Sequence, residues 1–290
     1  MMKKILKSIS LILLGIMILS QTNLAQRESA HDSINPPVFP IISGLHTLSI
    51  HVRDTITHDS VYNFLTGKLM LPIYYAPEKY GHQKYAGVYA GNMVLEPCGP
   101  FPDINYANDN FRSIFFGINF EVYKSLAAGE QKLNNRGFTR QVNKGSIYIR
   151  DSILCNENVF LALYEVTDKG KRDSLQNTMI TNGKNNPGIE YIKEIFIAYN
   201  EEVNLQRWKE FLYPLEFANK GICQINDSLT IYFTRGNINE VKGITFKVKS
   251  LAKAKQYFKN NNLLVFASGE KINLSSTQTF GLLIYFTDEE

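Results

Sequence analysis

Cysteine is scarce in this chain, and so are the sites that cysteine usually builds. The 290 residues contain three cysteines, at positions 98, 155 and 223. They lie far apart, which excludes a cysteine-pair metal motif. In an exported protein they allow one disulfide with a free thiol, or equally three buried thiols. No cysteine precedes Cys98, so a lipid-modified cysteine near the start is also excluded.

Long apolar segments are equally rare. A single apolar run, residues 9–19, follows three lysines and is shorter than the ~20 residues that a membrane span needs. This pattern predicts a signal peptide over residues 1–25, cleaved after Ala25, and therefore export to the periplasm or the cell exterior. An uncleaved N-terminal anchor is the alternative. Residues 26–42 are polar and then rich in proline, and they are expected to form a linker.

The sequence also lacks a cluster of basic residues. The net charge is +4, and the basic residues are spread along the chain rather than gathered in a stripe, which argues against a nucleic-acid partner. The sequence also contains no nucleophile elbow, phosphate-binding loop or zinc-protease motif. No membrane span is expected once the signal peptide is removed, which leaves a small molecule as the expected partner.

Aromatic residues, in contrast, are abundant, with 16 Tyr and 18 Phe, as is typical of a sheet-rich fold. Residues 47–52 alternate between apolar and polar side chains, which predicts a half-buried strand. A helix should follow, capped by Asp59 or Ser60. The same order of strand and helix then recurs three times, starting at residues 113, 192 and 243.

A change in composition divides the chain into two halves. Residues 168–188 are charged, rich in asparagine and without apolar periodicity. Such a segment favours a domain boundary. The sequence therefore predicts a first domain over residues 43–167, a linker over 168–188 and a second domain over 189–290.

The four openings, TLSIHVRD, GINFEVYKSLAAGEQKL, EIFIAYNEEVNLQRWKEFL and GITFKVKSLAKAKQYF, resemble module starts of the vicinal oxygen chelate, or glyoxalase-like, superfamily. The fragment YAGNMVLEPCG is similar to a later strand of such a module, and TFGLLIYFTDEE to a closing strand. The resemblance implies an α+β fold of two tandem glyoxalase-like domains. In each, paired βαβββ modules would form a cup-shaped mixed sheet with outer helices.

The resemblance also implies a divalent metal in the cup, held by His or Gln from the first strand and Glu from the last strand of each module. The matching positions are filled by Thr47, Glu96, Gly117, Leu163 or Glu165, Glu194, Gly243 and Tyr285. Glycine has no ligating side chain, and threonine is a poor ligand for transition metals. We therefore expect the usual metal site to be missing in both halves, and we predict no cofactor.

The first cup should still present polar side chains, and these are the candidate ligand-binding residues: Thr47, Ser49, His51, Glu96, Asn119 and Glu121. A displaced divalent-metal site built from His51, Glu96 and Glu121, with Glu165 as a further candidate, is the alternative. A third interpretation is that these residues are solvated strand ends. His46 would reach the position of Thr47 through a one-residue bulge, and would otherwise lie at the surface.

Three functions follow from these patterns. The first is an exported protein that binds a small, partly apolar molecule in the first cup without the family's metal. The second is a metal-dependent lyase, isomerase or dioxygenase with the displaced site. The third is a structural interaction module of the cell envelope. The segment 101–110 is rich in asparagine and proline, and we expect it to act as a lid over an open first cup.

Overall fold

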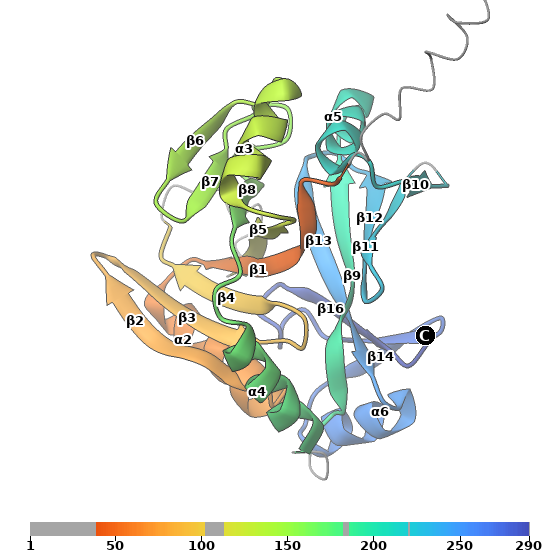
Figure 1. The fold of residues 1–290 in the computed structure, drawn as a ribbon. Helices are drawn as coiled ribbons and strands as arrows, with labels where there is room; N and C mark the ends of the chain where they lie inside the picture. The colour runs from red at the N-terminus through yellow and green to blue at the C-terminus, as the bar shows by residue number, and fades with distance from the viewer. Residues whose placement is uncertain (1–38, 102–112, 182–185, 220, 290) are drawn as a thin grey trace, which may run out of the picture. The chain divides into compact units, whose positions relative to one another are not determined.

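The computed structural model describes residues 39–101, 113–181, 186–219 and 221–289. The predicted signal peptide, most of the predicted linker before residue 42 and nearly all of the predicted lid lie outside these ranges. Residues Pro40–Glu290 form one compact unit, and Figure 1 shows its course from the red first strand to the blue last one. The predicted domain limits within this unit stay a prediction.

The first half of this unit contains two βαβββ modules. The elements of the first module are β1 (Ile42–Val52), α2 (Thr55–Asn63) with the π-helical turn η1 (Phe64–Lys68), β2 (Ile73–Tyr80), β3 (Gln83–Tyr89) and β4 (Val94–Gly99). The elements of the second are β5 (Ser113–Val122), α3 (Leu126–Asn135), β6 (Arg140–Asn143), β7 (Ser146–Ile149) and β8 (Phe160–Tyr164).

The second half repeats this order after the helix α4 (Lys169–Thr181). The elements of its first module are β9 (Ile189–Tyr199), α5 (Glu202–Leu212), β10 (Phe217–Ala218), β11 (Ile222–Asn226) and β12 (Leu229–Arg235). The elements of its second are β13 (Glu240–Val248), α6 (Leu251–Asn260), β14 (Val265–Ser268), β15 (Lys271–Leu274) and β16 (Leu283–Thr287). The four-module α+β fold predicted from the sequence is confirmed.

Strand pairing follows one rule in all four modules. The first strand of each module pairs in parallel with its last strand, and the first strands of two modules pair antiparallel, β1 with β5 and β9 with β13. An antiparallel pair between Val241 and Phe115 joins the halves into one mixed sheet. In Figure 1 the strands β2–β4 and β6–β8 form two walls of the first half, which meet at β1 and β5.

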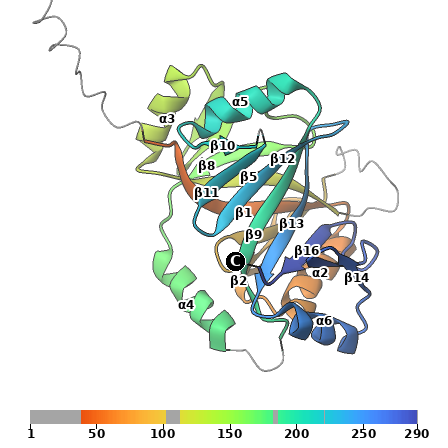
Figure 2. The ribbon, with the colours of Figure 1, turned by 90° about the vertical axis from the view of Figure 1, so that its right-hand side faces the viewer.

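Successive side chains of β1 point alternately toward the hydrophobic core and toward the cup. Leu48 and Ile50 are fully buried beneath the outer helix α2, which contributes Val61 to the same core. The intervening residues Thr47, Ser49 and His51 lie on the opposite face, the cup side. Figures 1 and 2 place α2 and α4 on opposite sides of the first module's strands, so α4 lies on the cup side.

One prediction about local structure is wrong. The first helix is capped by Asp54, whose side chain accepts a hydrogen bond of 2.6 Å from the Thr57 amide, not by Asp59 or Ser60. The residues that this first turn buries, Thr57 and His58, are polar. The apolar pattern therefore placed the start of the helix one turn too far along the chain. Most of the segment 168–188 is the helix α4, which the sequence pattern did not indicate because its side chains are mainly polar and charged. Its role as a linker between two domains stays a prediction.

The sequence pattern gave no indication of β2, an edge strand that contains Pro77 and is mostly exposed. Edge strands tolerate proline, because one side of the strand needs no hydrogen-bonded partner. Its exposed side chains follow no period of two, so nothing in the pattern indicated a strand. The strand nevertheless supplies one wall of the first cup.

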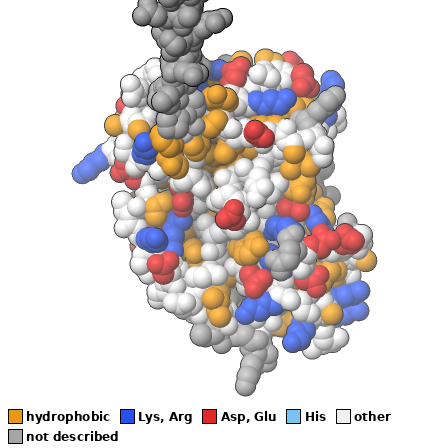
Figure 3. Space-filling model, turned by 45° about the vertical axis from the view of Figure 1, so that its right-hand side comes forward, with side chains coloured by type: hydrophobic (Ala, Val, Ile, Leu, Met, Phe, Trp, Pro, Cys, Tyr) orange, Lys and Arg blue, Asp and Glu red, His pale blue; other side chains and the backbone are white. Residues whose placement is uncertain are grey.

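Three general features bear on function. None of the helices in the described ranges is long and apolar enough to cross a membrane. The cysteines Cys98, Cys155 and Cys223 are all unpaired thiols. Figure 3 shows basic and acidic side chains interspersed over the visible face.

Candidate functional site

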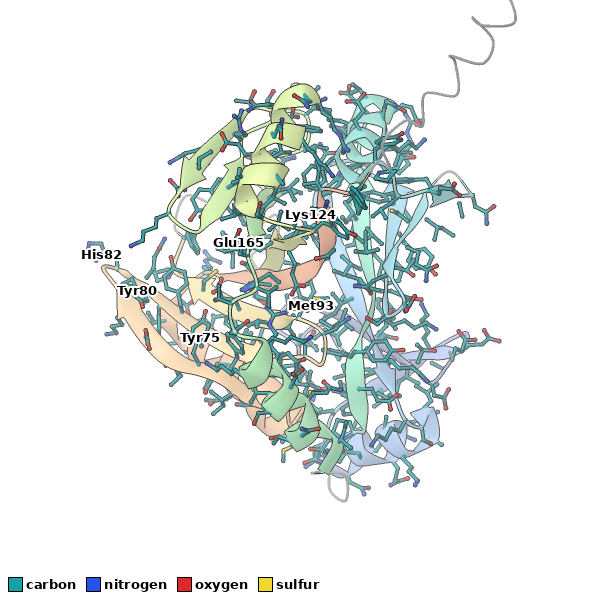
Figure 4. All side chains as sticks on the ribbon, in the orientation of Figure 1. Tyr75, Tyr80, His82, Met93, Lys124 and Glu165 are labelled. Atoms are coloured by element: carbon teal, nitrogen blue, oxygen red, sulfur yellow. The ribbon has the colours of Figure 1, made fainter. Side chains whose placement is uncertain are left out.

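The base of the first cup is a hydrogen-bonded carboxylate. Glu96 on β4 lies opposite Ser49 on β1, and the Ser49 hydroxyl donates to Glu96 Oε2 at 3.2 Å. The Tyr75 hydroxyl, from β2, donates to Glu96 Oε1, and Figure 4 labels Tyr75 on that wall of the cup. Three strands of one module therefore position a single carboxylate.

Tyr75 reaches Glu96 because the intervening strand carries a glycine. A Cβ placed on Gly87 would lie 2.4 Å from the Tyr75 ring, closer than any real contact. The ring therefore lies flat over β3, where the glycine leaves room for it. A side chain at position 87 would push the phenol away from the carboxylate.

Burial raises the pKa of Glu96, and the hydrogen bonds from Tyr75 and Ser49 oppose that shift only in part. Burial together with the adjacent carboxylate also raises the pKa of the Tyr75 phenol, which therefore stays a donor at neutral pH. A carboxylate with hydroxyl donors on both oxygens is fixed in orientation. Its remaining lone pairs can accept further hydrogen bonds from a molecule in the cup.

Asn119 extends this network across the sheet. It lies opposite Thr47, and its side-chain amide donates to Ser49 Oγ at 3.5 Å. The amide oxygen Oδ1 is buried and has no hydrogen-bond partner within the described ranges. An unsatisfied buried acceptor is costly, typically ~1–3 kcal/mol. Asn119 thus offers a second acceptor that a bound molecule or a water could satisfy.

Aromatic rings line the walls around these polar groups. Phe116 stacks on Phe160 with ring centroids 6.3 Å apart, and Tyr148 meets Phe160 edge-on at 5.3 Å. The ring of Phe160 lies near Gly117, opposite Ser49. This face of the sheet therefore combines the polar acceptors Glu96 and Asn119 with aromatic side chains.

His51 does not join this network. Its ring is stacked between Phe101 and Phe116, with centroids 3.9 Å from each. Burial lowers the pKa of His51 to about 3, and Nδ1 has no hydrogen-bond partner among the described residues. The ring is therefore neutral at physiological pH and packs as an aromatic side chain.

The displaced metal site is not assembled. The displaced site required the side chains of His51 and Glu121 to lie close together. Since β1 and β5 run antiparallel, His51 pairs with Ile114, whereas Glu121 pairs with Gly44. Seven residues of β1 separate these positions, roughly 23 Å at ~3.3 Å per residue. The two side chains lie at opposite ends of the cup.

Glu121 instead forms an ion pair with the helix α4. Its Oε1 accepts from Arg172 at 2.5 Å, and Arg172 Nε lies 3.2 Å from Asp168. Burial raises the pKa of Glu121, and the guanidinium opposes that rise. Glu121 and Arg172 line a cavity of about 610 Å³ together with Lys124 and Glu165. Figure 4 labels Lys124 and Glu165, which lie near the same end of β5 and β8.

The bulge considered for His46 is present, since the register of β1 shifts between Leu45 and Thr47. His46 Nδ1 lies 2.8 Å from Thr47 Oγ1, and its ring stacks on Tyr164 at 5.3 Å. Burial lowers the pKa of His46 to about 4. The bulge thus turns His46 into the cup, where it packs as a neutral ring.

The residues of the cups do not fit the metal that the family resemblance implies. Within the described residues, no three His, Cys, Asp or Glu side chains gather as a metal-binding group. A Cβ on Gly243 would lie 2.6 Å from the Leu283 carbonyl oxygen, so the backbone leaves no space for a ligand there. Glu194 is paired with Lys271. Three protein ligands, the usual number for a catalytic zinc, are not assembled.

Sequence reasoning missed three residues that the structure places in the cups: Tyr75, Arg172 and Lys271. Each lies on an element whose pattern was weak, namely the edge strand β2, the charged helix α4 and the short strand β15. Gly87 was the one available signal, because a glycine inside a strand often marks the close approach of another group.

Comparison with known proteins supports the fold alone. No family model matches the sequence, and no curated protein does either. A variant of 4-hydroxymandelate synthase from Streptomyces coelicolor is 9% identical and aligns over 84% of this chain and 92% of its own, with a TM-score of 0.55. A variant of homoprotocatechuate 2,3-dioxygenase from B. fuscum is 12% identical over 85% and 71%, with a TM-score of 0.53.

A third structure is a xylose isomerase-like TIM barrel/4-hydroxyphenylpyruvate dioxygenase fusion protein. It is 12% identical, with a TM-score of 0.57, and aligns over 92% of this chain but 52% of its own length. The present chain therefore spans about half of that protein. All three alignments extend over most of this chain with TM-scores above 0.5, which shows a shared fold. The chain has the fold of the vicinal oxygen chelate proteins.

Proposed function

We propose that the chain is an exported protein that binds a small, partly apolar molecule in the first cup without a metal ion. The observation that carries this proposal is the Glu96 carboxylate, which Tyr75 and Ser49 hold at the base of an aromatic cup. Export rests on the N-terminal sequence pattern.

The polar groups of the cup define the chemistry of the ligand. Glu96 has lone pairs to spare, and Asn119 Oδ1 is a buried acceptor without a partner among the described residues. Both groups can accept hydrogen bonds from donors on a ligand. The matching ligand carries a hydroxyl or amine group on an apolar body, because the surrounding wall is made of Phe116, Tyr148 and Phe160.

The test uses two probes that differ in one donor. 4-Methylphenol carries a hydroxyl group, and 4-methylanisole is its methyl ether, which has a similar body but no donor. Isothermal titration of the purified chain should show binding of 4-methylphenol at least tenfold tighter than that of the ether, as expected for a hydrogen bond to a charged group of ~1.5–3 kcal/mol.

The variant Glu96→Gln tests whether the preference for 4-methylphenol over its ether arises in the first cup. The variant Glu157→Gln, which changes an exposed glutamate, is the matched control. We expect Glu96→Gln to lose the tenfold preference while its folded circular-dichroism spectrum is retained, since glutamine preserves the size of the side chain. Glu157→Gln should bind as the wild type does. Equal binding by both variants would contradict the proposal, and unfolding of Glu96→Gln would show that Glu96 is a structural anchor.

The pH dependence of binding provides a second check. Burial raises the pKa of Glu96, so its carboxylate takes up a proton at a higher pH than an exposed glutamate does. A neutral carboxyl loses acceptor strength. The affinity for 4-methylphenol should therefore fall as the pH is lowered from 7.5 to 4.5, and Glu96→Gln should abolish this change.

A further inference from the structure

The Glu96 carboxylate is desolvated enough for burial to raise its pKa, yet both of its hydrogen-bond partners are neutral. These partners are the hydroxyl groups of Tyr75 and Ser49. Besides burial, only these two hydroxyl groups among the described residues influence the pKa of Glu96, so no cationic side chain in that part of the chain lies beside it. A desolvated carboxylate without a cation is unfavourable, because nothing replaces the hydration of its charge.

The chain treats its other desolvated carboxylates differently. Three of them each have a cationic partner: Glu121 with Arg172, Asp151 with Arg207, and Glu194 with Lys271. Among these four carboxylates, Glu96 is therefore the exception. The positive charge that it lacks within the described residues can be supplied by a molecule that enters the cup.

Glu96 can be reached from the cup, because Glu96, Tyr75 and Tyr85 are all partly exposed. Asn119, whose side chain binds the same Ser49 hydroxyl as Glu96 does, adds a buried amide oxygen that has no partner in the described ranges. A primary ammonium group has three N–H donors. It can therefore donate to the Glu96 carboxylate and to Asn119 Oδ1 at the same time.

Phenol rings surround the carboxylate on two walls of the cup. Tyr85 on β3 lies opposite Cys98, which is two residues from Glu96 along β4 and therefore on the same face. Burial, with Cys98 and Glu96 nearby, raises the pKa of Tyr85 to about 12. On the other wall, burial and Tyr148 raise the pKa of Tyr164, and the charge of Glu96 adds to this rise. The faces of such rings attract cations, most strongly where water is excluded.

We propose that the molecule bound in the first cup is a small arylalkylamine, whose protonated nitrogen is the counter-ion of Glu96. This inference rests on the proposed function and narrows the hydroxyl or amine group named there to an ammonium. An alkylamine carries its charge at pH 7.5, as the lysine side chain does. A metal ion is the other cation that a carboxylate can bind, but the described residues do not gather three ligands for one.

Isothermal titration of the purified chain with benzylamine and benzyl alcohol at pH 7.5 provides the test, because the two molecules share their ring and differ in charge. The wild type should bind benzylamine at least tenfold more tightly, a difference of ~1.4 kcal/mol. Glu96→Gln should bind both molecules equally. Glu157→Gln, which changes an exposed glutamate, should keep the preference.

Because Glu96→Gln could fail to fold, a second variant supplies the cation from the chain itself. Tyr85→Lys introduces an ammonium group near the carboxylate at a partly exposed position, and it should bind benzylamine no more tightly than benzyl alcohol. The matched control is Tyr213→Lys, which changes an exposed tyrosine at the end of α5 and should keep the preference.

The inference is overturned if the wild type does not prefer benzylamine, or if folded Glu96→Gln or Tyr85→Lys keeps the preference. The binding of 4-methylphenol separates this failure from a failure of the proposed function. A wild type that binds 4-methylphenol without preferring benzylamine contradicts the ammonium ligand alone. A wild type that binds none of the three molecules contradicts the proposed function as well.

Discussion

The stacked ring of His51 leads to a prediction about stability. A group whose folded-state pKa is lowered from 6.5 to about 3 binds its proton more readily in the unfolded chain. It therefore contributes stability that is present above pH 6.5 and is lost as the pH falls toward 3. We expect His51→Phe to remove this loss, because phenylalanine preserves the stack with Phe101 and Phe116 and does not titrate.

The size of the effect follows from the two pKa values. Between pH 6.5 and pH 4.5 the unfolded state takes up a proton at His51 and the folded state does not. At ~1.36 kcal/mol for each pH unit over which a full proton is taken up, the wild type loses about 2.3 kcal/mol over this interval relative to the variant, because the unfolded imidazole is already half protonated at pH 6.5. Between pH 7.5 and pH 4.5 the loss is about 2.7 kcal/mol. The raised pKa of Glu96 acts in the opposite direction, but it is common to both proteins and cancels in their difference.

Urea unfolding of both proteins at pH 7.5 and pH 4.5 gives this difference directly. The free energy of unfolding of His51→Phe, minus that of the wild type, should rise by about 2.7 kcal/mol on acidification. The variant His82→Phe changes an exposed histidine at the tip of the β2–β3 hairpin (Figure 4) and serves as the control. If the difference for His51→Phe does not change with pH, the ring is solvated and remains a candidate for proton transfer.

Two further variants test the contacts at the two ends of the first cup. Gly87→Ala should displace the Tyr75 ring, because the added Cβ would lie 2.4 Å from it, and should lower the free energy of unfolding by about 1–3 kcal/mol. Its thermal unfolding midpoint should therefore be lower than that of the control Gly67→Ala, whose added Cβ meets open space. Equal midpoints would contradict the packing described. Arg172→Met should lower the free energy of unfolding by about 3 kcal/mol, because it leaves Glu121 without its cation. If urea unfolding shows no such loss, the ion pair between Arg172 and Glu121 does not hold α4 against the sheet.

The fold could be predicted from the sequence because it depends on repeated local patterns. The alternation from Thr47 to Val52 predicted a strand, and the structure confirms it. Ser125 and Ser250, which are residue types typical of helix N-caps, lie where the helices α3 and α6 begin. The repeated order of these elements then indicated four modules. Elements without apolar periodicity, such as β2 and α4, could not be predicted in this way.

The candidate site was predicted only in part, because a strand pattern gives the face of a residue but not its neighbours across the sheet. Ser49, Glu96 and Asn119 were placed on the cup face, and the structure brings these three together. The antiparallel pairing of β1 with β5, which separates His51 from Glu121, requires tertiary information.

The central claim is that the first cup binds its ligand without a metal ion. Its most direct test is the affinity for 4-methylphenol, measured by isothermal titration on protein treated with EDTA and again after addition of equimolar Fe²⁺, Mn²⁺ or Zn²⁺. The account predicts the same affinity within about twofold in every sample, with loss of binding in Glu96→Gln. Binding that occurs only in a metal-loaded sample would contradict it.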